Sequence, residues 1–171
     1  DLMPALNLIP DPVFLRDMVP QDGKIHKDSW GTAYCFPPAA PGPHPMVNKD
    51  NAVIKDIEHW KEQLVVPPLD GLDWSFAEET AKTMDREEKF CALFCAGGLF
   101  ERSHHLMGMQ TALENYLEYP DEMYELLRVI ADYKIEYFKV ATKHMKPDIV
   151  FYHDDWGTKQ NVFLPPSVWR E

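Results

Sequence analysis

The fold is read most directly from residues 146–169, KPDIVFYHDDWGTKQNVFLPPSVW. The apolar run Ile149–Tyr152 ends abruptly in His153–Asp155, and a glycine turn and a new helix start follow it. This pattern predicts a buried parallel strand with polar side chains at its carboxyl end. In a (β/α) barrel the active site lies at that end of the strands. Two adjacent carboxylates there are costly unless they bind something polar, cationic or protonic.

The rest of the chain alternates between helical and extended patterns. Hydrophobic periodicity predicts a short helix at 12–18, a strand at 30–36, helices at 51–64, 74–87, 100–119 and 121–146, and a second buried strand at 90–96. The helix at 100–119 is expected to break near Gly108. Two apolar strands separated by helices predict a parallel crossover unit.

The helix at 121–146 has the clearest pattern in the chain. Its inner stripe is predicted to consist of Met123, Leu126, Leu127, Ile130, Tyr137, Phe138, Ala141 and Met145. Lys143, His144 and Lys146 suit the negative end of the helix dipole, and Pro147 ends the helix.

These elements lead us to expect an α/β fold that is part of a (β/α)8 TIM barrel. About three strands are recognisable, whereas a closed barrel needs eight strands and typically ~250 residues. Residues 1–171 are therefore expected to form a single incomplete barrel domain, truncated at both ends, with a smaller α/β layer as the alternative. The chain begins without Met and stops as a helix starts, so we expect an internal piece of a longer protein.

The composition restricts the class of partner. Hydrophobic residues make up 45% and aromatic residues 12% of the chain, which is typical of a globular protein rather than a disordered one. A formal net charge of -11 argues against nucleic acid and anionic membrane as partners. No apolar run approaches the roughly 20 residues of a membrane span. Cys35, Cys91 and Cys95 form no disulfide framework, so a cytoplasmic location is expected.

Asp154 and Asp155 are the first candidates for chemistry. Neighbouring carboxylates can share a proton, bind a metal or hold a cationic or hydroxyl-bearing substrate. Successive strand residues point to opposite faces, so one of the two is expected to face a pocket. The alternative is structural: one carboxylate caps the turn at Gly157, and the other pairs with a neighbouring base.

A second group of candidates lies in GGLFERSHHLMG, residues 97–108. Gly97-Gly98 allows a tight turn after the strand at 90–96. Glu101, Arg102 and His105 then arrive at the same edge of the sheet as the two aspartates. Glu101 and His105 are four residues apart, so they share one face of a helix and can act in proton transfer or hold a metal. A helical surface with an ordinary ion pair is the alternative.

The Pro-rich segment 37–45, PPAAPGPHP, is expected to be a loop that covers or borders a site. His44 within it is a candidate substrate contact, although a loop histidine is more often solvated. Phe36, Tyr152 and His153, at the ends of the two flanking strands, are further candidates for substrate binding. No phosphate-binding glycine loop, nucleophile elbow or zinc-type Cys/His spacing is present.

Three segments resemble the uroporphyrinogen decarboxylase superfamily. Residues 151–171, FYHDDWGTKQNVFLPPSVWRE, resemble its DDWG(S/T)Q…LF(M/L)(S/P)P…WRE segment. GGLFERSHHLMG resembles a segment after an earlier strand, and PGPHPMV…VIKDIEHWKE, within residues 41–62, is similar to a linker and helix. The three segments occur in the family's order and together cover most of residues 28–171. The resemblance implies a (β/α)8 barrel with its site in the C-terminal mouth.

The family has two functional branches. True decarboxylases act on the tetrapyrrole without a cofactor. The methyltransferases move methyl groups between a corrinoid protein and a thiol, a folate or a methoxylated compound, often with zinc. His105 stands where the decarboxylase segment GPFTLASYL has its tyrosine, and Asp155 replaces the serine of SWAG. These differences make the chain more similar to the methyltransferase branch.

The resemblance implies a corrinoid-linked methyltransferase or O-demethylase. Its candidate catalytic residues are Asp154, Asp155, Glu101 and His105, and its candidate substrate-binding residues are Arg102, His153, Tyr152, His44 and Phe36. Zinc and a corrinoid are possible cofactors of the intact protein, but no metal ligand can be assigned within this chain. The implied partners are a small methyl donor or a porphyrinogen, a corrinoid protein and a second copy of the chain. Uroporphyrinogen decarboxylase and a non-catalytic half-barrel subunit are the alternatives.

Overall fold

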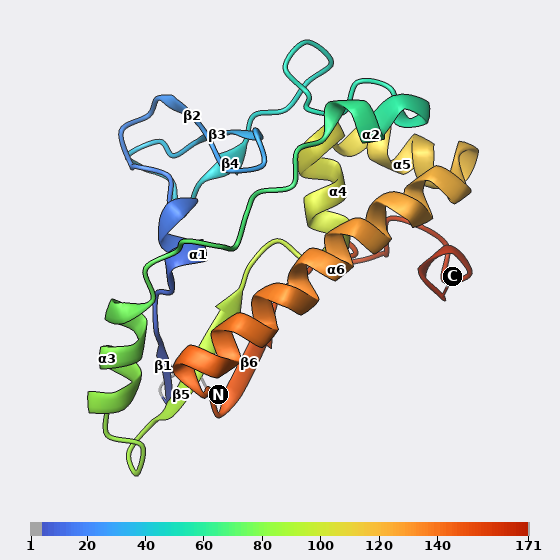
Figure 1. Ribbon diagram of the computed structural model, residues 1–171. Helices are drawn as coiled ribbons and strands as arrows, with labels where there is room; N and C mark the ends of the chain where they lie inside the picture. The colour runs from blue at the N-terminus through green and yellow to red at the C-terminus, as the bar shows by residue number, and fades with distance from the viewer. Residues whose placement is uncertain (1–4, 171) are drawn as a thin grey trace.

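The computed structural model describes residues 5–170, which form two small sheets and six α-helices (Figure 1). The first sheet is parallel, with strand order β1-β5-β6, and contains β1 (Leu6–Leu8), β5 (Phe90–Cys95) and β6 (Ile149–Tyr152). The second sheet is antiparallel, with order β2-β3-β4, and contains β2 (Ile25–Lys27), β3 (Ala33–Cys35) and β4 (His44–Pro45).

The helices carry most of the ordered chain. They are α1 (Pro12–Arg16), α2 (Trp60–Gln63), α3 (Ser75–Thr83), α4 (Leu99–Met107), α5 (Met109–Glu118) and α6 (Pro120–Met145), with short 3-10 turns η2 (Ile57–His59) and η3 (Val168–Arg170). The predicted break between α4 and α5 is confirmed at Gly108, whose φ of 90° suits glycine better than any other residue. None of the helices in the described part of the chain is long and apolar enough to cross a membrane.

The prediction of a partial (β/α)8 barrel is wrong. The parallel sheet of the described residues has three strands and does not close, and the other three strands pair among themselves in an antiparallel sheet. Closure into a barrel requires each strand to have a neighbour on both sides, which β1 and β6 lack in residues 5–170. The alternative of a smaller α/β arrangement describes the chain correctly.

The predicted parallel crossover is confirmed. β5 and β6 pair in parallel from Ala92–Ile149 to Cys95–Tyr152, with three helices between them. β6 is nevertheless not the buried strand that its apolar sequence predicts, because it lies at the edge of the sheet. Val150, Phe151 and Tyr152 are 47%, 38% and 42% exposed.

Two helical predictions are wrong. A helix was predicted for residues 51–64, but regular structure covers only residues 57–63. Ile54 donates its backbone N–H to the carbonyl of Leu106, 3.0 Å away, and Asp56 caps the short turn that follows. The helix expected after Gly157 is absent, and within the described residues η3 is the one helical turn beyond this glycine. The Pro-rich loop also contains the short strand β4, which pairs with β3.

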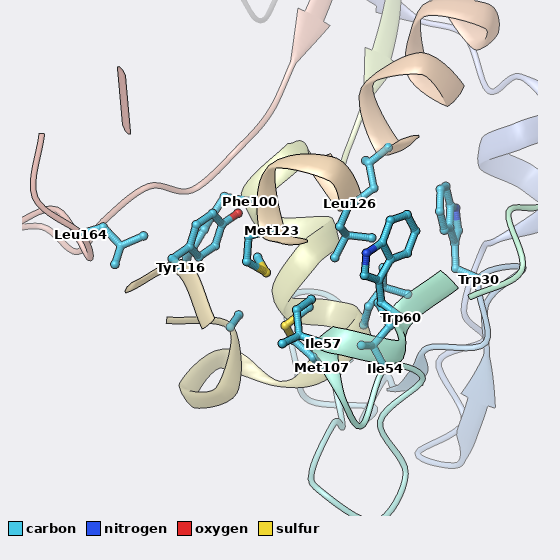
Figure 2. Close-up of a cluster of buried hydrophobic side chains, with 13 residues drawn as sticks. Trp30, Ile54, Ile57, Trp60, Phe100, Met107, Tyr116, Met123, Leu126 and Leu164 are labelled. Carbon is cyan, nitrogen blue, oxygen red and sulfur yellow. The ribbon is translucent and has the colours of Figure 1, made fainter. Parts of the chain in front are cut away.

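Helix α6 joins two hydrophobic clusters and runs along the length of the molecule, as the orange ribbon in Figure 1 shows. Its first half contributes Met123, Leu126 and Ile130 to a cluster with α4, α5 and the two tryptophans Trp30 and Trp60 (Figure 2). Its second half contributes Tyr137, Ala141 and Met145 to a cluster with α3 and one face of β5. The helix thereby fixes the parallel sheet relative to α4 and α5.

Candidate functional site

A cavity of about 620 Å³ lies at the carboxyl end of β5. Cys95 and Gly97 form part of its wall where the strand ends, and α4 and α6 contribute neighbouring walls. The segment that contains the antiparallel sheet supplies Trp30, Tyr34 and Phe36. The location agrees with the general rule that ligands of parallel sheets bind beyond the carboxyl ends of the strands. The volume is within the range of small-molecule sites.

Glu101, His153 and Asp155 form a chain of polar side chains beside this cavity. Nδ1 of His153 lies 3.3 Å from Oε2 of Glu101, and Nε2 lies 3.7 Å from Oδ1 of Asp155. Glu101 and His153 line the cavity, whereas the side chain of Asp155 is 70% exposed. The arrangement places a histidine between two carboxylates, which can orient its ring and exchange a proton with a bound ligand.

Asp154 has a structural position. Its two carboxylate oxygens accept hydrogen bonds from the backbone N–H groups of Phe100 at 3.0 Å and Glu101 at 2.9 Å. These groups belong to the first turn of α4, where a carboxylate satisfies otherwise unpaired donors and the helix dipole. Asp154 does not line the cavity among the described residues. The two predicted aspartates therefore have different positions: Asp154 caps α4, and Asp155 lies beside His153.

Gly98 makes this capping contact possible. A Cβ atom at Gly98 would overlap the side chain of Asp154, so this position has no room for another residue in the present arrangement. The Gly98 N–H also donates to Oε2 of Glu101 at 3.3 Å, so Glu101 closes the first turn of α4 from the other side. The turn after β5 thus sets the positions of both Asp154 and Glu101.

Arg102 is neutralised within the protein. Its Nη1 donates to Oδ2 of Asp28 at 2.6 Å, and the two side chains are 11% and 2% exposed. The guanidinium also lies 5.1 Å from the ring of Trp30, in a cation–π contact. Oδ1 of Asp28 accepts the backbone N–H groups of Trp30 and Thr32. Arg102 therefore ties the turn between β2 and β3 to α4.

His105 is buried against Tyr34. Nδ1 of His105 lies 2.9 Å from the Tyr34 hydroxyl, and which group donates depends on the tautomer. Burial, with smaller contributions from His104 and Arg102, lowers the pKa of His105 to about 3. Burial also raises the pKa of Tyr34 to about 12, so both groups are neutral at pH 7. His105 is thus available as a hydrogen-bonding group in the cavity wall and not as a reservoir of protons.

The structure brings five of the nine predicted residues to the cavity. Glu101, Arg102, His105, His153 and Phe36 line it. Asp154, Asp155, Tyr152 and His44 do not line it. His44 is exposed in β4, and Tyr152 lies on β6 and is 42% exposed.

The sequence did not reveal Lys134 of α6, which also lines the cavity. Its side chain is 8% exposed, and its Nζ lies 3.5 Å from Sγ of Cys95. The signal that could have found it is its spacing: Lys134 is four residues after Ile130 and three before Tyr137, in the middle of the apolar stripe. Asp28, Trp30 and Tyr34 were missed because they come from a segment remote in sequence.

The donor set does not match a zinc centre. Within residues 5–170, no group of three or more His, Cys, Asp or Glu side chains is placed to hold a metal ion. Glu101, His153 and Asp155 lie close together, and their contacts are those of hydrogen bonds and ion pairs.

Comparisons with protein-family models, with curated proteins and with solved structures find no match to this chain. The resemblance to the uroporphyrinogen decarboxylase superfamily thus stays a prediction.

Proposed function

We propose that the protein is a methyltransferase or O-demethylase that transfers a methyl group from a small methoxylated compound to a corrinoid protein, with a thiol or folate as the final acceptor. The observation that carries the proposal is the cavity at the end of β5, whose lining combines aromatic side chains with the Glu101–His153 pair. The sequence segments similar to the methyltransferase branch support it.

The cavity suits a flat, weakly polar ligand. Trp30, Tyr34, Phe36 and Tyr133 contribute aromatic surface to its walls. Aromatic side chains favour stacked or edge-on contacts with an aromatic ligand and bury a large apolar area. A methoxylated aromatic ring therefore matches the lining better than a highly charged compound does.

The Glu101–His153 pair supplies the proton that demethylation requires. When the methyl–oxygen bond breaks, the ether oxygen keeps the electron pair and takes up a proton from the pair, which yields a hydroxyl group. A corrinoid, when bound, would supply the electron pair for the new bond to the methyl carbon. Asp155 at 3.7 Å holds the opposite side of the His153 ring. Proton transfer by a positioned side chain accelerates such reactions by about 10²–10⁴-fold.

Decarboxylation of uroporphyrinogen, the second implied function, receives less support from the cavity. A porphyrinogen carries eight carboxylates and needs several available cations. Arg102 is occupied by Asp28, which leaves Lys134 as the one other lysine or arginine among the residues that line the cavity. The decarboxylase alternative predicts release of carbon dioxide from uroporphyrinogen without a corrinoid.

A cytoplasmic location accompanies the proposal. Cys35, Cys91 and Cys95 are free thiols, which is usual in a reducing compartment. Cob(I)alamin chemistry also requires reducing conditions.

The proposal is tested by incubating the protein with cob(I)alamin and 3-methoxyphenol under anaerobic conditions. Methylcobalamin is followed by its absorption spectrum and resorcinol by mass spectrometry, and both should form in equal amounts. Glu101→Gln should lower kcat/KM by about 10²-fold or more, because glutamine keeps the size of the side chain but cannot transfer the proton.

Glu118→Gln is the matched control, because Glu118 is an exposed residue at the end of α5 away from the cavity. Its kcat/KM should equal that of the unaltered protein. Equal rates for Glu101→Gln and Glu118→Gln would remove Glu101 from the mechanism. Carbon dioxide release from uroporphyrinogen, with no methyl transfer, would replace the proposal by the decarboxylase.

A further inference from the structure

The buried amine of Lys134 indicates that this cavity binds a ligand. Its side chain is 8% exposed and lines the cavity, and its neighbours on the inner face of α6 are apolar. Burial of an ammonium group without a counter-ion costs several kcal/mol in a protein interior. This cost lowers the pKa of the Lys134 amine below its ordinary value, and an anion bound beside Nζ would offset the cost and keep the amine protonated.

Among residues 5–170, Lys134 has no directly paired anion, and the carboxylate of nearby Asp154 is hydrogen-bonded to the backbone of α4. Its Nζ donates to Sγ of Cys95 at 3.5 Å and lies 5.8 Å from the centre of the Tyr152 ring. No carboxylate of residues 5–170 forms an ion pair with Lys134, although eleven ion pairs occur elsewhere. Burial raises the pKa of the Cys95 thiol, so this sulfur is a weak, neutral acceptor.

We propose that Lys134 binds the carboxylate of a small aromatic acid in this cavity. The carboxylate would take the place of the missing counter-ion, and the aromatic ring would lie against the aromatic residues of the wall. A charge-assisted hydrogen bond of this kind is about twice as strong as a neutral one. Together with the proposed function, on which this step rests, Lys134 makes the substrate a methoxylated aromatic carboxylate.

The placement of the two polar groups agrees with such a ligand. Lys134 comes from α6 and the Glu101–His153 pair from α4 and the end of β6, and all three side chains line the same cavity. A benzoate with a methoxy group on its ring carries an anion at one position and the ether oxygen at another. Lys134 binds the carboxylate, and the ether oxygen is then free to take up a proton from the Glu101–His153 pair.

The test compares binding of 3-methoxybenzoate and 3-methoxybenzamide by isothermal titration calorimetry. The two probes have nearly the same shape and differ in charge. The unaltered protein should bind the acid at least about tenfold more tightly than the amide, which corresponds to about 1.4 kcal/mol. Lys134→Met should remove this preference and leave amide binding unchanged.

Lys139→Met is the matched control, because Lys139 lies on the same helix, is exposed and pairs with Glu136. It should bind both probes as the unaltered protein does. Lys134→Met should also unfold at the same or a higher urea concentration, because it replaces a buried amine by an apolar side chain of similar length. Loss of binding is then not caused by loss of the fold.

Tight binding of 3-methoxybenzoate by Lys134→Met, or no preference for the acid over the amide in the unaltered protein, would overturn the inference. Binding of the acid through Lys134 without methyl transfer to cob(I)alamin would leave the inference standing and contradict the proposed function. Methyl transfer from 3-methoxyphenol, with no preference for binding the acid over the amide, would support the proposed function and overturn the inference about Lys134.

Discussion

At the scale of single residues, His105 shows how burial changes the chemistry that a sequence predicts. The sequence identifies it as an acid, a base or a hydrogen-bonding group, and these roles differ in the charge of the ring. Tyr34 lies 2.9 Å from its Nδ1, and burial with His104 and Arg102 lowers its pKa to about 3. The ring is therefore neutral in the folded protein over the whole physiological range.

This lowered pKa predicts a loss of stability in acid. Below its ordinary pKa near 6.5, His105 takes up a proton in the unfolded chain but not in the folded one, so acidification from pH 6.5 towards 3 favours unfolding. The contribution reaches about 1.4 kcal/mol per pH unit. His105→Gln should show a smaller difference in the free energy of unfolding between pH 7 and pH 5, measured with urea. An equal difference in both proteins would contradict the lowered pKa.

At the scale of elements, the connection between β6 and α4 decides the geometry of the site. Asp154 at the end of β6 caps the first turn of α4, and Gly98 leaves room for its carboxylate. Gly98→Ala should therefore displace the cap and destabilise the fold by about 1–3 kcal/mol. Gly42→Ala is the matched control, because nothing lies within 4 Å of a Cβ atom at Gly42.

A double-mutant cycle separates this contact from a general effect of the added methyl group. In the Asp154→Ala protein the obstructing side chain is gone, so Gly98→Ala should cost much less free energy of unfolding than in the unaltered chain. Equal costs in the two backgrounds would show that Gly98 and Asp154 are not coupled. Urea unfolding of the four proteins gives all the required values.

The sequence predicts the helices and strands better than the long-range contacts that they make. Hydrophobic periodicity locates α1, α3, α4, α5, α6, β5 and β6 because each follows a regular local pattern. It fails for residues 51–56, where Ile54 bonds to Leu106 across the fold. The same limit applies to the site: Glu101, Arg102 and His105 stand out beside a strand end, whereas Lys134 is hidden in an apolar stripe and Asp28 becomes relevant only through Arg102.

At the scale of the whole molecule, the apolar composition of a strand does not show whether its sheet closes into a barrel. The apolar residues of β6 suggest a strand with neighbours on both sides, yet in the described chain β6 pairs with β5 alone. The number of strands that meet in one sheet depends on contacts between remote segments, which periodicity does not encode. The pairing of β2, β3 and β4 into a separate sheet is a second feature of this kind.

The open edge of β6 predicts self-association. Val150, Phe151 and Tyr152 are exposed along a strand whose outer hydrogen-bonding groups face no other strand of the described chain. Such an edge is a template for pairing with another chain, and a lysine placed on it opposes that pairing. Light scattering should show the apparent mass rising with protein concentration, and Val150→Lys should suppress the rise.

Val65→Lys, at a 77% exposed position outside the sheets, should not suppress it. A constant monomer mass in the unaltered protein would show that this edge stays unpaired, whereas equal suppression by both lysines would assign the effect to net charge.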